Sequence, residues 1–146
     1  MKFALYKGSG TLVDRLIRWW QRGPYSHVEA VLAENADGTF ECASSVRGTG
    51  VRIASIALPA SDWDIVEMPA DVDAVRAWFV QHAGAGYDYV GIFGFVVRPV
   101  GGEPGRYFCS EAIASALGIR EPFRLDPNAF ADFVSSVANL ARTPAE

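Results

Sequence analysis

A cysteine and a histidine in this chain could together perform nucleophilic catalysis. Cys109 follows a Gly/Pro-rich loop and begins an apolar segment that is predicted to be a helix. A thiol at a helix N-terminus lies near unpaired backbone N–H groups and the positive end of the helix dipole, and both favour the thiolate. The same N–H groups can bind an oxyanion. Cys109 is therefore the candidate nucleophile, with a buried structural thiol as the alternative.

A histidine is the usual base beside such a thiol, because its pKa lies near neutrality. The chain contains 2 His. His27 lies on a predicted strand, from which its ring can project rigidly. His82 lies late in a predicted helix, where a cation suits the C-terminal end of the dipole. We therefore take His27 as the candidate base.

An imidazole in this role needs a third polar group to orient it. Glu41 lies on the returning strand of a predicted hairpin and can lie beside His27 across that hairpin. Glu29 shares a sheet face with His27, but same-face neighbours in one strand are ~6.6 Å apart at Cα, which orients a ring poorly. We predict Glu41 and keep Glu29 as the alternative. Cys42 would then face the core as a structural thiol.

Composition limits the class of protein. A chain of 146 residues predicts one domain, and a hydrophobic fraction of 50% excludes a disordered chain. The net charge of −4 argues against a dedicated nucleic-acid binder. Two cysteines are too few for a disulfide scaffold, although one bridge could form. The spacings typical of metal sites and phosphate loops are missing, so we expect no metal and no cofactor.

Targeting signals are also missing from the sequence. The N-terminal apolar stretch is shorter than a signal-peptide core and is interrupted by Lys7. The longest apolar run, Val90–Val97, is far short of the ~20 residues that cross a bilayer. We therefore expect a cytoplasmic protein without a transmembrane segment, with export or virion association by other means left open. The sequence does not indicate the oligomeric state.

The elements that must position these residues follow from apolar periodicity and turn residues. Strands are concentrated between residues 26 and 68 and helices follow, which favours an α+β fold with a small antiparallel sheet packed against helices. We expect one catalytic domain over residues 1–140 and a frayed tail over 141–146. The predicted strands are Phe3–Tyr6, Tyr25–Glu34, Thr39–Ala43, Val51–Ile56 and Trp63–Met68. The predicted helices are Thr11–Arg22, Ala70–Gly84, a glycine-broken Tyr87–Val97, Phe108–Leu117 and a last helix capped by Asp126 that ends near Leu140.

The predicted helix Thr11–Arg22 carries charge and aromatic rings on different sides. Its arginines are Arg15, Arg18 and Arg22. A solvated helix face is the ordinary explanation for them, and contact with an acidic polymer or a membrane surface is the alternative. Aromatic residues such as Trp19, Trp20, Phe93 and Phe95 are expected to fill the core, with binding of an amphiphile as the alternative.

Four short segments together resemble a known family. They are YSHVEAV at Tyr25–Val31, FECA at Phe40–Ala43, GYDY at Gly86–Tyr89 and YFCSE at Tyr107–Glu111. They resemble the permuted branch of the NlpC-type, papain-like cysteine peptidase superfamily, which includes YiiX-like proteins and, more distantly, lecithin:retinol acyltransferase-like proteins. In that branch the histidine strand precedes the cysteine helix, as His27 precedes Cys109 here. The resemblance covers roughly residues 1–120 and implies a circularly permuted papain-like (NlpC-type) fold.

The resemblance also implies roles for individual residues. Cys109 would be the nucleophile, His27 the base and Glu41 the orienting residue of a Cys-His-Glu triad that acts through a thioester. The third residue varies across the superfamily and is often histidine, so Glu41 matches only some members. The neighbouring motif residues that we expect to contact substrate are Tyr25, Ser26 and Tyr107.

These residues lead to three hypotheses of function. The first is a cysteine peptidase or amidase, of bacterial or phage type, whose candidate substrates are peptidoglycan peptides. The second keeps the thiol chemistry and makes the chain an acyltransferase or thioesterase on lipid-like acyl donors. The third is a non-enzymatic interaction module that kept the fold. The expected partner is thus a peptide or acyl substrate in the first two cases and another macromolecule in the third.

Overall fold

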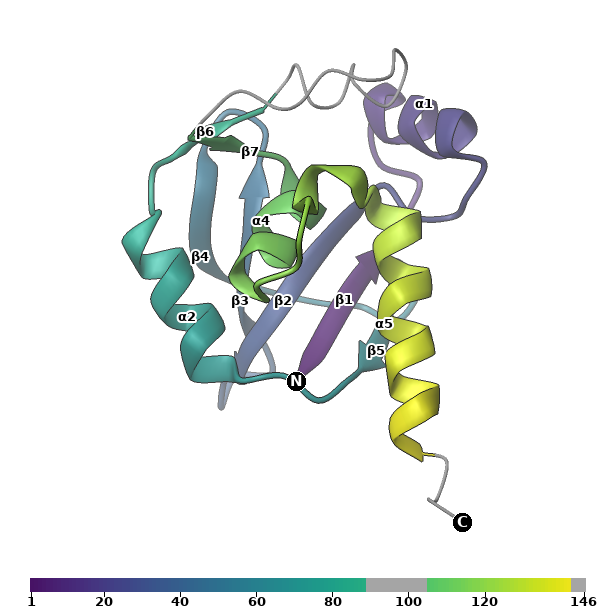
Figure 1. The fold of residues 1–146 in the computed structure, drawn as a ribbon. Coiled ribbons are helices and arrows are strands. Elements are labelled where there is room, and N and C mark those ends of the chain that lie inside the picture. Colours follow the sequence, from purple (N-terminus) through teal and green to yellow (C-terminus); the bar gives the residue numbers. More distant parts are fainter. Residues whose placement is uncertain (89–104, 143–146) are drawn as a thin grey trace.

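A five-stranded antiparallel sheet with the strand order β4-β3-β2-β1-β5 lies at the centre of the molecule (Figure 1). The computed structural model describes residues 1–88 and 105–142. The strands of the sheet are β1 (Lys2–Tyr6), β2 (His27–Glu34), β3 (Phe40–Val46), β4 (Gly50–Ile56) and β5 (Trp63–Glu67). A second, two-stranded parallel sheet joins β6 (Gly86–Tyr87) to β7 (Arg106–Tyr107).

Four α-helices pack around the sheet in the described residues, and three of them cover one of its faces (Figure 1). They are α1 (Leu12–Gln21), α2 (Val72–Gln81), α4 (Cys109–Ala116) and α5 (Pro127–Arg142), with a short 3₁₀ turn, η1 (Pro122–Arg124), before α5. In Figure 1, α2, α4 and α5 lie on the same side of the sheet, while α1 lies beyond its end. The predicted α+β class, with an antiparallel sheet packed against helices, is confirmed.

The main core lies between the sheet and the three covering helices. Alternate residues of the strands supply its sheet side, including Phe3, Leu5 and Val28, because side chains two positions apart share a face. The helices supply Phe79, Ile113 and Phe130, all of which are fully buried. The ring of Phe3 meets that of Phe130 edge-on at 5.5 Å between centroids, which ties β1 to α5.

A smaller apolar cluster covers the opposite face of the sheet. It contains Ala4, Val31 and Cys42, with Leu58 packed against them. Leu58 lies in the connection from β4 to β5, which are the two edge strands. The connection therefore crosses this face of the sheet and covers it without a helix.

Local sequence signals account for most element boundaries. Thr11 caps α1, and its hydroxyl and backbone N–H both bond the Asp14 carboxylate. The Asp71 carboxylate caps α2 by accepting hydrogen bonds from the backbone N–H groups of Asp73 and Ala74. Asp126 accepts hydrogen bonds from two N–H groups of the first turn of α5, at 2.9 Å each, as predicted for its N-cap. Gly50 must stay a glycine because its φ is +78° and an added Cβ would lie 2.0 Å from the Ala85 carbonyl oxygen.

The structure corrects several expectations at this level. The strand predicted over Thr39–Ala43 extends three residues further, to Val46, and α5 continues to Arg142 rather than ending near Leu140. Of the helix predicted over Tyr87–Val97, Tyr87 belongs to β6, and positions 89–97 lie outside the described residues, as do Phe93, Phe95 and the end of the tail, 143–146.

The first testable consequence concerns the core contact between β1 and α5. Replacing Phe130 by alanine should lower the free energy of unfolding by about 3–5 kcal/mol, because it leaves a cavity against Phe3. Chemical denaturation monitored by circular dichroism measures this change. The matched control is Leu140→Ala on the same helix, whose side chain is exposed and whose loss should change stability by less than about 0.5 kcal/mol. Equal losses in the two variants would contradict the assignment of the core.

Candidate active site

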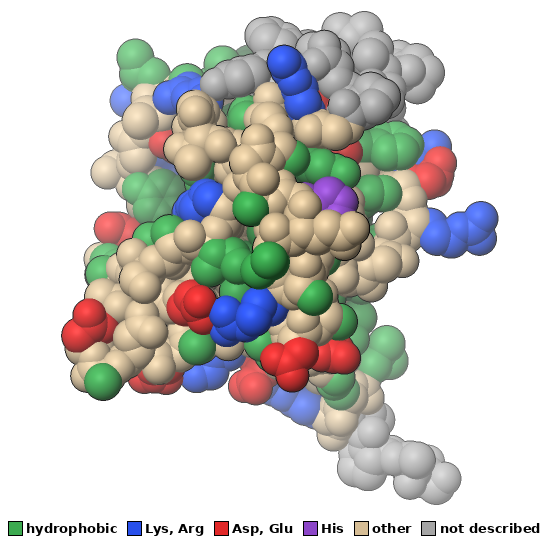
Figure 2. All heavy atoms as spheres, turned by 90° about the vertical axis from the view of Figure 1, so that its left-hand side faces the viewer, with side chains coloured by type: hydrophobic (Ala, Val, Ile, Leu, Met, Phe, Trp, Pro, Cys, Tyr) green, Lys and Arg blue, Asp and Glu red, His purple; other side chains and the backbone are tan. Residues whose placement is uncertain are grey.

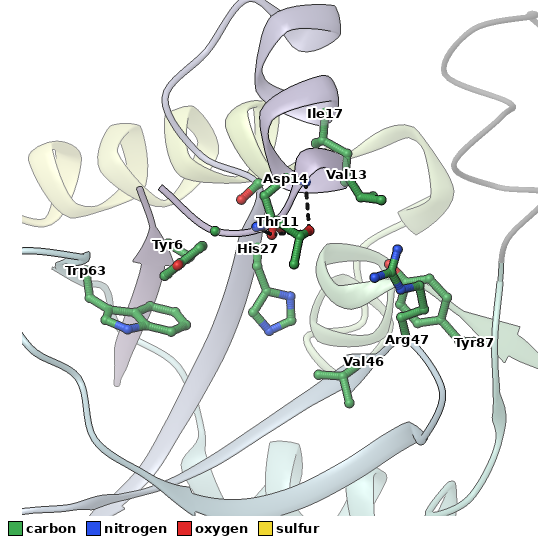
Figure 3. Close-up of a pocket in the computed structure, with 12 residues that line it drawn as sticks. Tyr6, Thr11, Val13, Asp14, Ile17, His27, Val46, Arg47, Trp63 and Tyr87 are labelled. Atoms are coloured by element: carbon green, nitrogen blue, oxygen red, sulfur yellow. Dashed lines mark hydrogen bonds between the residues drawn. The ribbon is translucent and has the colours of Figure 1, made fainter. Parts of the chain in front are cut away.

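One end of the sheet brings together the residues that could do chemistry. β1 ends there, β2 begins there, β3 ends there, and Trp63 of β5 pairs with Tyr6 of β1 at the same end. A pocket of about 380 Å³ opens at this end (Figure 3). Its walls come from the strand ends, from α1 and from the turn after β3, and they include Tyr6, Thr11, Val13, Ile17, Ser26, His27, Arg47 and Trp63.

The His27 ring projects into the space between two sides of this pocket. Figure 3 shows the aromatic rings of Tyr6 and Trp63 on one side of it and Arg47 with Tyr87 on the other. The indole of Trp63 stands edge-on to the imidazole, with 6.3 Å between ring centroids. A ring held by the first residue of a strand and backed by an aromatic side chain is well placed to act on a bound molecule.

Glu29 orients this ring. The Nε2 atom of His27 lies 2.7 Å from Oε1 of Glu29, two residues along β2. The carboxylate is buried, with 1% of its side chain exposed, and Arg52 of β4 holds it from the far side through two hydrogen bonds of 2.8 and 2.5 Å. The result is a continuous chain of charge-assisted contacts from Arg52 through Glu29 to His27.

Cys109 is the first residue of α4, and its thiol lies next to the same imidazole ring. Its thiol is close enough to hydrogen-bond the imidazole and to act on it through charge. Because Nε2 is occupied by Glu29, the nitrogen that remains for the sulfur is Nδ1. The structure therefore brings the two residues together across 82 positions of sequence.

The charges around His27 determine its protonation. Burial is the largest influence and lowers the pKa of His27, but the Cys109 sulfur and the Glu29 carboxylate together outweigh it and raise that pKa to about 10. Burial also acts to raise the pKa of Glu29, and His27 and Arg52 reverse this and lower it. At neutral pH the site thus holds an imidazolium between the Glu29 carboxylate and the Cys109 sulfur.

The N-terminus of α4 presents backbone N–H groups around the sulfur. The first hydrogen bond of the helical ladder runs from Ala112 N to Phe108 O, so the N–H groups of Cys109 and Ser110 precede that ladder. The Ser110 hydroxyl is used elsewhere, in a bond to the Leu125 carbonyl of 2.6 Å. The backbone geometry at Cys109 is therefore that of an oxyanion-binding helix terminus.

Glu111 lies in the first turn of α4 and binds the backbone at the start of the helix. Its carboxylate accepts a hydrogen bond from Phe108 N at 3.3 Å, which caps the helix. Burial raises the pKa of Glu111 to about 7, assisted by the nearby Asp88. Glu111 thus holds the helix start in place.

The predicted role of Glu41 is wrong. Glu41 lies opposite Ala33 in the β2–β3 register, far along the strand from His27, and a register shift lies between Val31 and Ala33. It projects on the helix-covered face, where Arg76 of α2 binds it through two hydrogen bonds of 2.8 and 2.6 Å. The alternative, Glu29, makes the contact because a glutamate side chain spans the distance along the strand that separates two same-face Cα atoms.

Two of the three predicted substrate contacts, Tyr25 and Tyr107, are not among the residues that line this pocket. The Tyr25 hydroxyl donates to Asp64 at 2.9 Å, and its backbone N–H and carbonyl are both held by the Asn128 side-chain amide at 2.9 Å. The Tyr107 ring packs edge-on against Trp78, with 5.2 Å between centroids. Both residues therefore position the segments that carry His27 and Cys109.

Ser26 is the predicted contact that does line the pocket. It is buried, and within the part of the chain that the structure describes its hydroxyl has no hydrogen-bond partner. A buried hydroxyl is normally hydrogen-bonded, so an unpaired one beside His27 is available to a bound molecule.

Cys42 is buried on the same sheet face as His27 and Glu29, not on the helix-covered face. Burial raises the pKa of Cys42 to about 12, and the Glu29 carboxylate adds to this. Both cysteines are free. Cys42 is accordingly an inert core thiol, and the bridge to Cys109 considered above is not formed.

Sequence reasoning missed Arg52, Trp63 and Arg47. A signal for Arg52 was present, since the run HVEAVLA places Glu29 among apolar residues of a strand. A buried carboxylate requires a cationic partner from another element.

Among residues 1–88 and 105–142, no group of three or more His, Cys, Asp or Glu side chains is arranged to hold a metal ion.

Comparison with known proteins identifies no family: no family model matches the chain, and no curated protein matches it. In the described ranges, no helix has both the length and the apolar character needed to cross a membrane.

The ion pairing of His27 can be tested directly. Replacing Glu29 by glutamine should lower the pKa of His27 by about 1–3 units, because it removes the carboxylate charge that favours the imidazolium. NMR titration of the imidazole resonances measures the change. Glu41→Gln is the matched control and should leave the His27 titration as it is. A shift in the control, with none in Glu29→Gln, would reverse our assignment of the two glutamates.

Proposed function

We propose that the protein is a cysteine hydrolase that cleaves amide bonds with Cys109 as nucleophile, His27 as general acid–base and Glu29 as the residue that positions the imidazole. The observation that carries the proposal is the juxtaposition of thiol, imidazole and buried carboxylate at one end of the sheet. The similarity of the YSHVE and FCSE segments to the permuted papain-like branch supports the same chemistry.

The proposed reaction proceeds in two stages. The Cys109 thiolate attacks the carbonyl carbon, and N–H groups at the start of α4 hold the oxyanion. The C–N bond then breaks as the His27 imidazolium gives its proton to the departing amine, which leaves a thioester on Cys109. Water attacks the thioester, His27 accepts the proton of that water, and the carboxylic acid departs as the thiolate–imidazolium pair is restored.

Two features of the pocket support a peptide substrate that carries a carboxylate. The Arg47 side chain lies at the wall of the pocket, where a guanidinium can bind a carboxylate. The unpaired Ser26 hydroxyl can donate to a substrate carbonyl. Stem peptides of peptidoglycan offer both groups, and they are the substrate class that we propose.

The second candidate is an acyltransferase or thioesterase acting on lipid-like acyl donors. The observation in its favour is the apolar part of the same pocket, where Val13 and Ile17 of α1 face Trp63 across the space around His27. The chemistry at Cys109 would be the same up to the thioester. The two candidates differ only in which acyl group the pocket accepts.

Activation of the thiol is the first property to measure. Alkylation of Cys109 by iodoacetamide should remain rapid below pH 7 and should fall by about tenfold or more in His27→Ala, because the imidazolium is lost. Cys42→Ser is the matched control and should label like the parent protein, since burial raises the pKa of the Cys42 thiol to about 12 and keeps it protonated. Labelling that rises only near pH ~8.5, as for a free thiol, and that is indifferent to His27→Ala would refute the enzyme hypotheses and leave the interaction module.

Substrate class is resolved by a paired assay. We expect the protein to release amines from peptidoglycan fragments, and we expect Cys109→Ser and His27→Ala each to reduce the rate by about 10³-fold or more. Arg47→Gln should raise KM for carboxylate-bearing fragments more than it lowers kcat, since it removes binding and not chemistry. Turnover of long-chain acyl thioesters with no turnover of the peptide fragments would instead favour the second candidate.

A further inference from the structure

Helix α1 turns three polar residues, Asp14, Arg18 and Gln21, toward the protein together with Ile17, and it leaves a set of large apolar side chains exposed. None of its residues is buried. The side chains of Leu12, Leu16 and Trp19, which follow one another at helical spacing, are 78%, 60% and 71% exposed. This contradicts the expectation that Trp19 fills the core, and Trp20 is likewise 44% exposed.

Polar contacts fix this orientation. The Arg18 guanidinium donates to the carbonyl oxygens of Gly8 and Ser9. The Gln21 amide oxygen accepts a hydrogen bond of 2.9 Å from Asn128 of α5. These contacts fix the rotation of α1 about its own axis. They therefore determine that Leu12, Leu16 and Trp19 form an apolar stripe that faces solvent.

The charges beside the stripe indicate what covers it. Arg15 and Arg22 are both exposed. At 100° per residue Arg15 lies about 40° from Trp19 on the helix surface, and Arg22 is the C-cap residue that directly follows the helix. A helix with Leu and Trp on one side and arginines beside them is typical of a helix that lies in a membrane interface. Tryptophan favours the headgroup level of a bilayer, and arginine favours anionic headgroups.

The face of the molecule away from α1 does not share this pattern (Figure 2). Figure 2 shows the side of the molecule away from α1, where acidic and basic side chains are interspersed and hydrophobic ones lie in small groups. With a net charge of −4, the chain as a whole is repelled by an anionic surface. Binding to such a surface must therefore be confined to a local site.

We propose that α1 docks the protein on an anionic lipid surface, with Leu12, Leu16 and Trp19 entering the interface and Arg15 and Arg22 binding the headgroups. The same helix supplies Val13 and Ile17 to the pocket wall, so docking holds the pocket next to the lipid surface. This inference stands on the exposed face of α1 and does not require the proposed hydrolase activity.

Vesicle flotation tests the proposal. The parent protein should float with vesicles of phosphatidylcholine and phosphatidylglycerol and should bind pure phosphatidylcholine vesicles far more weakly. Combining Arg15→Gln with Arg22→Gln should weaken binding to the anionic vesicles by about 25-fold, or about fivefold for each arginine. Combining Leu16→Ser with Trp19→Ser should weaken it by about tenfold or more.

Matched controls come from the last turn of α5, which lies at the opposite end of the molecule in Figure 1. Leu140→Ser removes an equally exposed apolar side chain, and Arg142→Gln removes an exposed charge, so both should float like the parent. Circular dichroism and Cys109 alkylation check that the α1 variants are folded. If the α1 variants no longer float with vesicles but still show rapid alkylation of Cys109, lipid docking is lost while the candidate site is intact. The test therefore distinguishes this inference from the proposed function.

Three results would overturn the proposal. The first is the absence of flotation with anionic vesicles. The second is flotation that the α1 variants do not reduce, or that the α5 controls reduce equally. The third is a parent protein that elutes as a dimer in size-exclusion chromatography and becomes a monomer in Leu16→Ser/Trp19→Ser without binding vesicles, since the stripe would then bind a second copy of the chain.

Discussion

The arrangement of the candidate site depends on keeping one carboxylate charged in the interior. Burying an isolated carboxylate costs several kcal/mol, and the cost is offset only when its partners are in place on both sides. Arg52 from β4 and His27 from β2 do this for Glu29. A slip of β2 by one residue would turn Glu29 toward the apolar, helix-covered face. The ion pair thus fixes the register of the strands as well as the orientation of the imidazole.

The sheet and α4 contribute different parts of the proposed chemistry. The sheet supplies the acid–base group, because β2 begins with His27 and carries its partner two residues later. α4 supplies the sulfur together with backbone N–H groups at its first turn. The proposed chemistry requires both parts, and the packing of α4 against β2 and β3 sets the distance between them. The rigidity of the core is therefore what holds the sulfur in reach of the imidazole.

The sequence was sufficient for features that local rules determine. The N-cap Asp126, the α+β class and the candidacy of Cys109 and His27 depend on neighbouring residues and on residue type. Glu41 was predicted wrongly because the shift in the β2–β3 ladder is a tertiary detail that residue spacing does not reveal. The outward side of α1 escaped prediction for a related reason, since remote partners such as Asn128 determine it. Long-range polar contacts were the missing information in both cases.

The double hydrogen bond between Asn128 and the backbone of Tyr25 has a consequence for biosynthesis. It joins the segment just before His27 to the first turn of α5, which follows both His27 and Cys109 in the chain. A nascent chain therefore carries its thiol and its imidazole before it has the helix that locks their supporting segments together. The segment before His27 can be held in place only after α5 has been synthesised, so a chain that stops before Asn128 would lack this support for the candidate site.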